Sequence, residues 1–247
     1  MIQPTDTLSS IAAQFPCAIQ VLEEAGVDYC CHGDRTVDQA CREKGLQWET
    51  LAAAIQNVPT ATQEPTVDWT REPLVALIRH ILSTHHEFLK RGLPRLSEQL
   101  GRVQIAHPRD REMLQPLAQV FTGLFEELDQ HMAKEERILF PFIDQMEAAI
   151  AQGKPPIQLP FGTMRNPIGM MEYEHESAGR ALKEIRHLTS AFIPPPHACA
   201  TYCALYEGLR ELERDLHLHI HLENNILFPR ALDLESRAGS LAAFARK

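Results

Sequence analysis

The 247-residue sequence predicts an all-α protein in which a four-helix bundle follows a small helical domain. Apolar residues recur at three- and four-residue spacing through long segments, which is the period of helices with one buried face. Proline-rich breaks divide these segments into lengths that suit the helices of a bundle. The clearest apolar stripes are Leu117, Val120, Phe121, Leu124, Phe125 and Leu128, and later Leu205, Leu209, Leu212 and Leu216.

Four long helices are expected, at about residues 71–101, 110–150, 167–192 and 198–234. Residues 1–57 are expected to form the small helical domain, residues 58–68 a polar linker, residues 69–235 the bundle and residues 236–247 a tail. Pro141 and Pro229 fall inside the second and fourth long helices. There a proline removes a backbone donor, so both helices are expected to kink or distort.

One element of the sequence is duplicated. His131-Met-Ala-Lys-Glu135 and His219-Ile-His-Leu-Glu223 lie 88 residues apart, and each runs on into Ile-Leu-Phe-Pro. A His-Glu step precedes each copy, at His86 and at His175, 45 and 44 residues upstream. The two halves of the bundle therefore carry the same polar residues in the same order.

The spacing within each copy indicates metal binding. A His and a Glu at i and i+4 share one helix face, and both continue the apolar stripe into the bundle, where an unpaired carboxylate is costly. A single His on an apolar face is more often a core residue than a ligand, but duplication in register is hard to explain that way. Four His and two Glu form a ligand set for two metal ions, with both Glu able to bridge: His86, His131, Glu135, His175, His219 and Glu223.

The donor types limit the metal. Nitrogen and oxygen ligands without thiolates suit iron, manganese or zinc, and spacing alone does not decide among them. Iron is favoured, as a redox-active pair that meets dioxygen or nitric oxide. His85 adjoins His86 and is an alternative ligand, but the register of the repeat favours His86.

Cysteines supply the second chemical feature. Cys30 and Cys31 are adjacent, with His32 beside them, in a chain whose six cysteines do not resemble a secreted disulfide framework. The pair could bind a metal, accept a nitrosyl group or carry electrons, and a purely structural role is about as well supported. Cys199 and Cys203 are interpreted as packing residues near the start of a helix.

Composition excludes several classes of partner. The net charge of −9 and the isoelectric point near 5.7 argue against nucleic acids and anionic membranes. No apolar run approaches the roughly 20 residues of a membrane-spanning helix. The first residues lack the pattern of a signal peptide, so a cytoplasmic location is expected.

The chain resembles the repair-of-iron-centres proteins, the di-iron iron–sulfur cluster repair proteins of bacteria, over residues 5 to 232. The resemblance rests on Asp28-Tyr29-Cys30-Cys31-x-Gly33 followed by the repeated His-x3-Glu-x2-Ile-Leu-Phe-Pro element. One departure is His32, where many relatives carry a small residue, and it leaves the chemistry of the thiols open.

The resemblance implies a hemerythrin-like bundle with two iron ions per chain, bridged by both Glu and an oxo group. It further implies a cytoplasmic protein that repairs iron–sulfur clusters after nitrosative or oxidative stress by donating iron and handling nitric oxide. The implied partners are damaged iron–sulfur proteins and a small ligand, nitric oxide or dioxygen. A homodimer is compatible with this role, and nucleic acid and membrane are not expected.

Two other functions remain open at this level. A hemerythrin that binds or senses dioxygen has a similar bundle, but it uses five histidines where four are counted here. A di-iron nitric oxide reductase would use the same site with turnover. Reversible oxygenation would favour the former, and sustained nitrous oxide production the latter.

Overall fold

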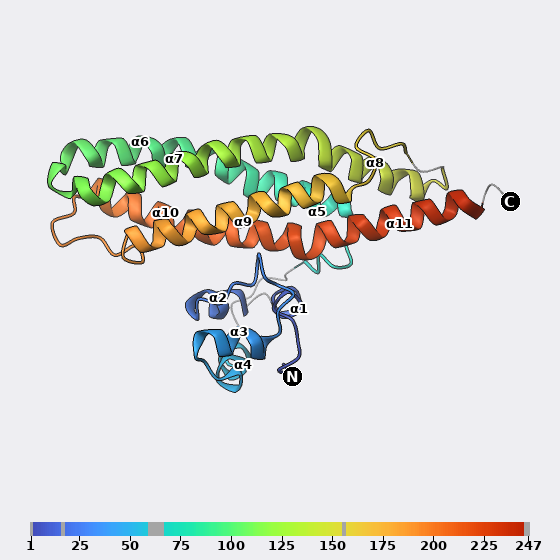
Figure 1. The fold of residues 1–247 in the computed structure, drawn as a ribbon, viewed down its shortest axis with the longest axis horizontal. Helices are drawn as coiled ribbons and strands as arrows, with labels where there is room; N and C mark the ends of the chain where they lie inside the picture. Colours follow the sequence, from blue (N-terminus) through green and yellow to red (C-terminus); the bar gives the residue numbers. More distant parts are fainter. Residues whose placement is uncertain (1, 16–17, 59–66, 155–156, 245–247) are drawn as a thin grey trace.

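The computed structural model describes residues 2–15, 18–58, 67–154 and 157–244. It shows a long helical bundle with a small helical domain packed against its side (Figure 1). Within the described residues there is no strand, only an isolated bridge between Thr7 and Thr36, so the predicted all-α fold is confirmed. Across the same ranges, none of the helices is both long enough and apolar enough to span a bilayer.

The four long helices lie close to their predicted positions, and three are built of two α-helices joined by a π-helical turn. The first comprises α5 (Leu74–Ile81), the turn Leu82–His86 and α6 (Glu87–Ala106); the second comprises α7 (Arg111–Lys134), the turn Glu135–Leu139 and α8 (Phe140–Ala151). The third is α9 (Arg165–Leu188) alone. The fourth comprises α10 (Ala200–Leu222), the turn Glu223–Leu227 and α11 (Phe228–Phe244).

The predicted tail is mostly helical, and most of the predicted linker is not described. Helix α11 continues to Phe244, through most of the segment predicted as a tail, and Ala238 within it is buried. The apolar period of the bundle therefore extends past residue 235. Of the predicted linker, residues 59–66 lie outside the described residues.

The predicted distortion at the two prolines is confirmed and takes the form of π-helical turns. The backbone N–H of Phe140 donates to the carbonyl of Glu135, and that of Phe228 donates to the carbonyl of Glu223. Each is an i to i−5 bond, placed just before a proline that has no N–H to donate. Each of these two turns begins at a Glu of the duplicated element, whereas the third, Leu82–His86, ends at a predicted ligand and has no proline after it.

The core of the bundle is split by a polar layer. One apolar cluster joins α6, α7, α9 and α10, and a second joins α5, α8, the start of α9 and α11. All six predicted metal ligands lie in the chain between segments that belong to the two clusters, and all six are buried. Buried polar groups at such a place require partners.

The internal duplication reaches beyond the metal-binding element. Glu147, in α8, accepts hydrogen bonds from the backbone N–H groups of Leu74 (2.8 Å) and Val75 (2.9 Å), at the start of α5. Glu235, which is 88 residues later, accepts one from the backbone N–H of Met164 (3.1 Å), just before α9. In each half, a Glu on one long helix thus satisfies the free backbone donors at the start of the other.

The small domain consists of α1 (Leu8–Gln14), α2 (Ala18–Glu24), α3 (Val37–Lys44) and α4 (Trp48–Gln56). Thr36 and Gln39 form a capping box that fixes the start of α3. Ile220 of α10 belongs to the apolar core of this domain. The ring of Tyr29 packs against that of His221 at 5.6 Å, so the domain is docked on the fourth long helix.

Replacing Glu147 with alanine is expected to lower the free energy of unfolding by about 1–3 kcal/mol, because two backbone donors lose a charged acceptor. Urea denaturation followed by circular dichroism measures the change. Asp144→Ala, at an exposed position of the same helix, is the control and is expected to cost about 0.5 kcal/mol or less. Equal losses in the two variants would contradict the proposed capping role.

Candidate metal centre

The predicted ligands come from all four long helices. His131 and His219 lie in the last turns of α7 and α10, and Glu135 and Glu223 open the π-helical turns that follow. His86 ends the π-helical turn of the first long helix. His175 comes from the middle of α9.

These side chains form two overlapping groups whose ligand atoms lie within 4.8 Å of one another. Both carboxylates belong to both groups, which is the arrangement expected of bridging ligands. Each group therefore combines residues from both halves of the duplicated sequence. The first group is His86, Glu135, His219 and Glu223, and the second is His131, Glu135, His175 and Glu223.

The distances are those expected between ligands of a shared metal ion. The Nε2 atoms of His131 and His175 are 3.0 Å apart, which is the separation of two nitrogens that each lie about 2.1 Å from one ion at a right angle. Glu223 lies 3.1 Å from His175 and 3.0 Å from His219. Glu135 lies 3.4 Å from both His86 and His131.

Several atoms of this cluster are buried without a hydrogen-bond partner among the described residues. They include both carboxylate oxygens of Glu135 and of Glu223 and the Nε2 atoms of His86 and His219. Unsatisfied polar atoms are costly in an apolar interior, and two carboxylates at close range repel each other. Cations bound between them would remove both costs, so the residues fit a metal centre.

The electrostatics of the cluster show the same conflict. Burial and the neighbouring charge of Glu223 raise the pKa of Glu135. Burial opposes protonation of His131, but the charges of Glu135, Glu174 and Glu223 raise its pKa to about 9. Burial lowers the pKa of His219 to about 3. The carboxylates thus favour a positive charge on His131, whereas His219 stays neutral, which is the form of imidazole that binds a metal.

Acceptors outside the cluster orient three of the four imidazoles. The Nδ1–H of His86 donates to Glu136 (2.8 Å), that of His175 donates to Asn224 (2.7 Å) and that of His131 donates to Glu174 (2.9 Å). With the proton on Nδ1, each Nε2 is left free to face the cluster. His219 Nδ1 has no such acceptor in the described part of the chain.

Glu136 and Asn224 occupy matching positions in the two copies of the duplicated element. The structure gives this position its role, because each residue follows a Glu of the cluster and holds the His of the other long helix in its half. In the sequence, the signal for this role was that the two residues occupy equivalent positions of the duplicated element. The match differs in charge, a carboxylate in the first half and a neutral amide in the second.

His85 belongs to neither ligand group. Its Nδ1 lies 2.9 Å from Asp215, and its ring stacks on that of His219 at 5.4 Å. His86, by contrast, contributes to the first group. The geometry therefore agrees with the repeat register, which favours His86.

The Cys30-Cys31 loop lies against the helix that carries His175. The Sγ of Cys31 is 3.8 Å from the backbone carbonyl of His175, and the Sγ of Cys30 is 3.8 Å from that of Cys31. The hydrogen bond with Cys31, together with burial and Asp28, raises the pKa of Cys30, so this sulfur is held as a thiol. The pair therefore borders the metal centre without belonging to either ligand group.

Two asparagines hold the loop in place. Asn224 and Asn225 donate side-chain hydrogen bonds to the backbone carbonyl of Cys30, at 3.4 and 3.2 Å. A side chain at Gly33 would collide with Asn225 and come within 2.8 Å of the carbonyl of Tyr29, which explains the glycine of the motif. Asn224 thus contacts both the cysteine loop and His175.

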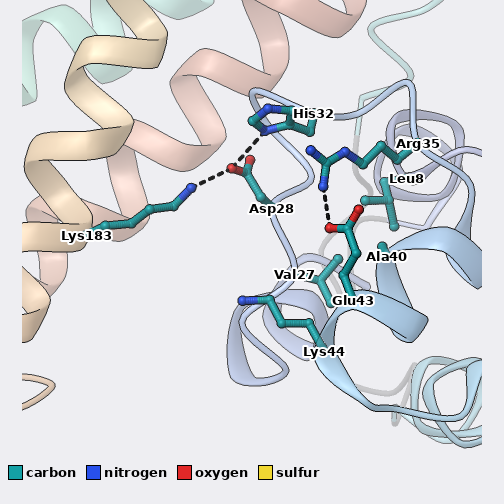
Figure 2. Close-up of a pocket in the computed structure, with 9 residues that line it drawn as sticks. All are labelled: Leu8, Val27, Asp28, His32, Arg35, Ala40, Glu43, Lys44 and Lys183. Atoms are coloured by element: carbon teal, nitrogen blue, oxygen red, sulfur yellow. Dashed lines mark hydrogen bonds and ion pairs between the residues drawn. The ribbon is translucent and has the colours of Figure 1, made fainter.

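A small pocket opens beside this loop, between the small domain and α9 (Figure 2). Asp28 lies on its wall, where its carboxylate contacts Lys183 (3.0 Å) and His32 (3.2 Å). Burial opposes ionisation of Asp28, but Lys183 more than offsets it and holds the pKa of the carboxyl well below its usual value. This ion pair joins the cysteine loop to α9.

The bundle and its duplicated ligands define a metal-binding protein of the hemerythrin class. Residues 77–231 match the family described as the hemerythrin HHE cation binding domain, and residues 4–59 match a domain of unknown function, DUF542. The chain is similar to the iron-sulfur cluster repair protein YtfE of Pectobacterium atrosepticum, with 37% identity over 92% of this chain and 96% of the relative. It is 39% identical to the protein of that name from Escherichia coli O8, over 91% and 96%.

The chain therefore belongs to the hemerythrin HHE family and, over nearly its whole length, to the family of iron-sulfur cluster repair proteins. The family predicted from the two motifs is confirmed.

Replacing Asn224 with alanine is expected to lower metal affinity about 10–100-fold, because His175 loses the acceptor that orients its ring. Competition with a chelator measures the affinity. Asn225→Ala, which also releases the Cys30 carbonyl but does not touch His175, is the matched control and should leave the affinity near wild type. Equal weakening by both would show that docking of the loop, not the His175 bond, is responsible.

Stability of the metal-free protein should depend on pH through Glu174. A hydrogen bond from His131, together with Lys134, lowers its pKa from 4.5 to about 2. Because the pKa is lower in the folded state, the stability from this carboxylate is complete above about pH 4.5 and is lost as the pH falls toward 2. The stability difference between wild type and Glu174→Gln should therefore shrink between about pH 6 and pH 3. Glu176→Gln, exposed on the same helix, should show a small difference at every pH, and a pH-independent effect of Glu174→Gln would refute this prediction.

Proposed function

We propose that this protein repairs iron–sulfur clusters damaged by nitrosative or oxidative stress, and that it does so by donating iron and handling nitric oxide. The observation that carries the proposal is the pair of overlapping ligand groups that share both Glu135 and Glu223. Family membership supports it, since the similar relatives carry the name of iron-sulfur cluster repair proteins. The proposed partners are damaged iron–sulfur proteins, with nitric oxide or dioxygen as a small ligand.

Two iron ions per chain are the proposed cofactor. Their ligands would be His86, His131, Glu135, His175, His219 and Glu223, with both carboxylates bridging. Such a centre supplies redox chemistry toward small molecules when it is loaded. Imidazole and carboxylate ligands without thiolates suit iron in this role.

The rest of the chain supports this use of the site. The two apolar clusters that flank the polar layer limit access of water to the ligands. Glu136, Glu174 and Asn224 orient three imidazoles with Nε2 toward the cluster. His219 is the one imidazole of the four whose Nδ1 has no acceptor among the described residues, so we propose its side of the first group as the side from which iron is released.

Cys30 and Cys31 are the proposed reactive thiols. They lie on the turn that carries His175, and Asn224 links their loop to that ligand. A change at the sulfurs can therefore reach the metal centre through one hydrogen-bonded side chain. Cys30 stays protonated while Cys31 is paired with it, so Cys31 is the better candidate for the first reaction.

The number of imidazoles in the cluster favours this function over dioxygen binding. A hemerythrin-type oxygen carrier would call for a fifth imidazole. The two ligand groups contain four, and His85, the buried imidazole next in sequence, belongs to neither group.

Metal content tests the proposed centre. Protein purified without oxygen should contain about two iron ions per chain, with the Mössbauer spectrum of a coupled pair. His86→Ala should lose iron, whereas His85→Ala, the neighbouring residue, should keep it. A single iron ion in the wild-type protein, or equal loss in the two variants, would refute the assignment.

Repair itself needs a separate assay. Iron-loaded protein is mixed with a cluster enzyme inactivated by nitric oxide, and recovery of activity is compared with that from an equal amount of free iron. The proposal predicts greater recovery with the protein. It also predicts that the double variant Cys30→Ser, Cys31→Ser keeps its iron but loses the advantage. Recovery no better than with free iron would refute the repair function.

A further inference from the structure

A second group of metal-ligating side chains lies at the end of the bundle that is remote from the C-terminus. Two connections meet there, the one between α6 and α7 and the one between α9 and α10 (Figure 1). His107 and Asp110 come from the first connection, and His197 comes from the second. Their ligand atoms lie within 4.8 Å of one another.

The contacts within this group have the dimensions of a metal site. His197 Nε2 lies 2.9 and 3.1 Å from the two carboxylate oxygens of Asp110. Two ligand atoms that are each about 2.0–2.1 Å from one ion are separated by about 3 Å. The rings of His107 and His197 have centroids 6.0 Å apart, so both imidazoles can turn toward the same point.

The thiols near this group are not among its donors. Cys199 directly precedes α10, and both Cys199 and Cys203 are exposed, which corrects their interpretation as packing residues. The three donors within reach of one another are two imidazoles and one carboxylate.

The second connection is held rigid. Phe192 is buried, and the guanidinium groups of Arg186 and Arg210 lie 5.1 and 6.0 Å from its ring centroid. Residues 194–196 are all proline, and the backbone N–H of Ala198 donates to Pro195. His197 is therefore presented without the conformational freedom of an ordinary surface loop, which lowers the entropic cost of binding an ion.

We propose that His107, Asp110 and His197 bind a divalent transition-metal ion, and that Zn²⁺ fits this set best. Two imidazoles and one carboxylate, with water at the remaining position, are a combination that zinc accepts and that magnesium and calcium do not favour. The site would join two connections that the sequence separates by about 90 residues. It shares no residue with the central cluster, so it stands or falls apart from the repair function.

The test uses the full-length, iron-loaded protein titrated with Co²⁺ in place of Zn²⁺. We expect one additional Co²⁺ per chain, with the visible bands of a four-coordinate ion held by nitrogen and oxygen ligands, abolished by Zn²⁺ and without loss of iron. His197→Ala and Asp110→Asn should weaken this binding by roughly tenfold or more. His197 is exposed, so its replacement should leave the fold intact, which circular dichroism checks.

A matched histidine variant separates the site from a general effect of losing an imidazole. His187→Ala, an exposed residue of α9 outside this group, is the control and should bind Co²⁺ as wild type does. If the wild-type protein takes up no Co²⁺ beyond the central cluster, or if His197→Ala binds as much as wild type, His197 and Asp110 form only an inter-loop hydrogen bond and the proposal is refuted.

Discussion

Two carboxylates buried among four imidazoles are the constraint on which the rest of the bundle depends. Glu135 and Glu223 have no exposed surface and no hydrogen-bond partner in the described structure. Isolated charges in such a place would destabilise the fold by several kcal/mol, so the site is coherent only as a cation-binding layer. The two apolar clusters on either side hold that layer closed. Metal binding and folding are therefore expected to be coupled.

The internal duplication gives the bundle an approximate two-fold relation, and its chemistry lies in the departures from that relation. Glu147 and Glu235 repeat faithfully, since both satisfy free donors at the start of a helix. Around the cluster the two halves differ, because the position of Glu136 in the first half is occupied by Asn224 in the second. An amide can accept from His175 and still donate to the Cys30 carbonyl, which a carboxylate could not do. The half of the bundle that faces the small domain is thus the half that carries the amide.

The π-helical turns show how sequence chemistry places the ligands. Each Ile-Leu-Phe-Pro run puts a proline, which has no backbone donor, directly after the residue that closes its π-helical turn. The turn starts at the Glu that the cluster uses. A locally disfavoured residue is therefore retained beside a functional one, as at other sites where backbone irregularity positions a side chain.

The sequence alone determined the helical class, the approximate helix limits, the family and the six residues of the cluster, because helical periodicity and a duplicated motif are local and repeat in register. It did not reveal that Asn224 and Glu174 orient the imidazoles, that the cysteine loop rests on the turn of His175, or that His107 meets His197. These contacts join residues that are 43 to 144 positions apart. No local pattern encodes such distances, so only the packing of the helices and their connections decided them.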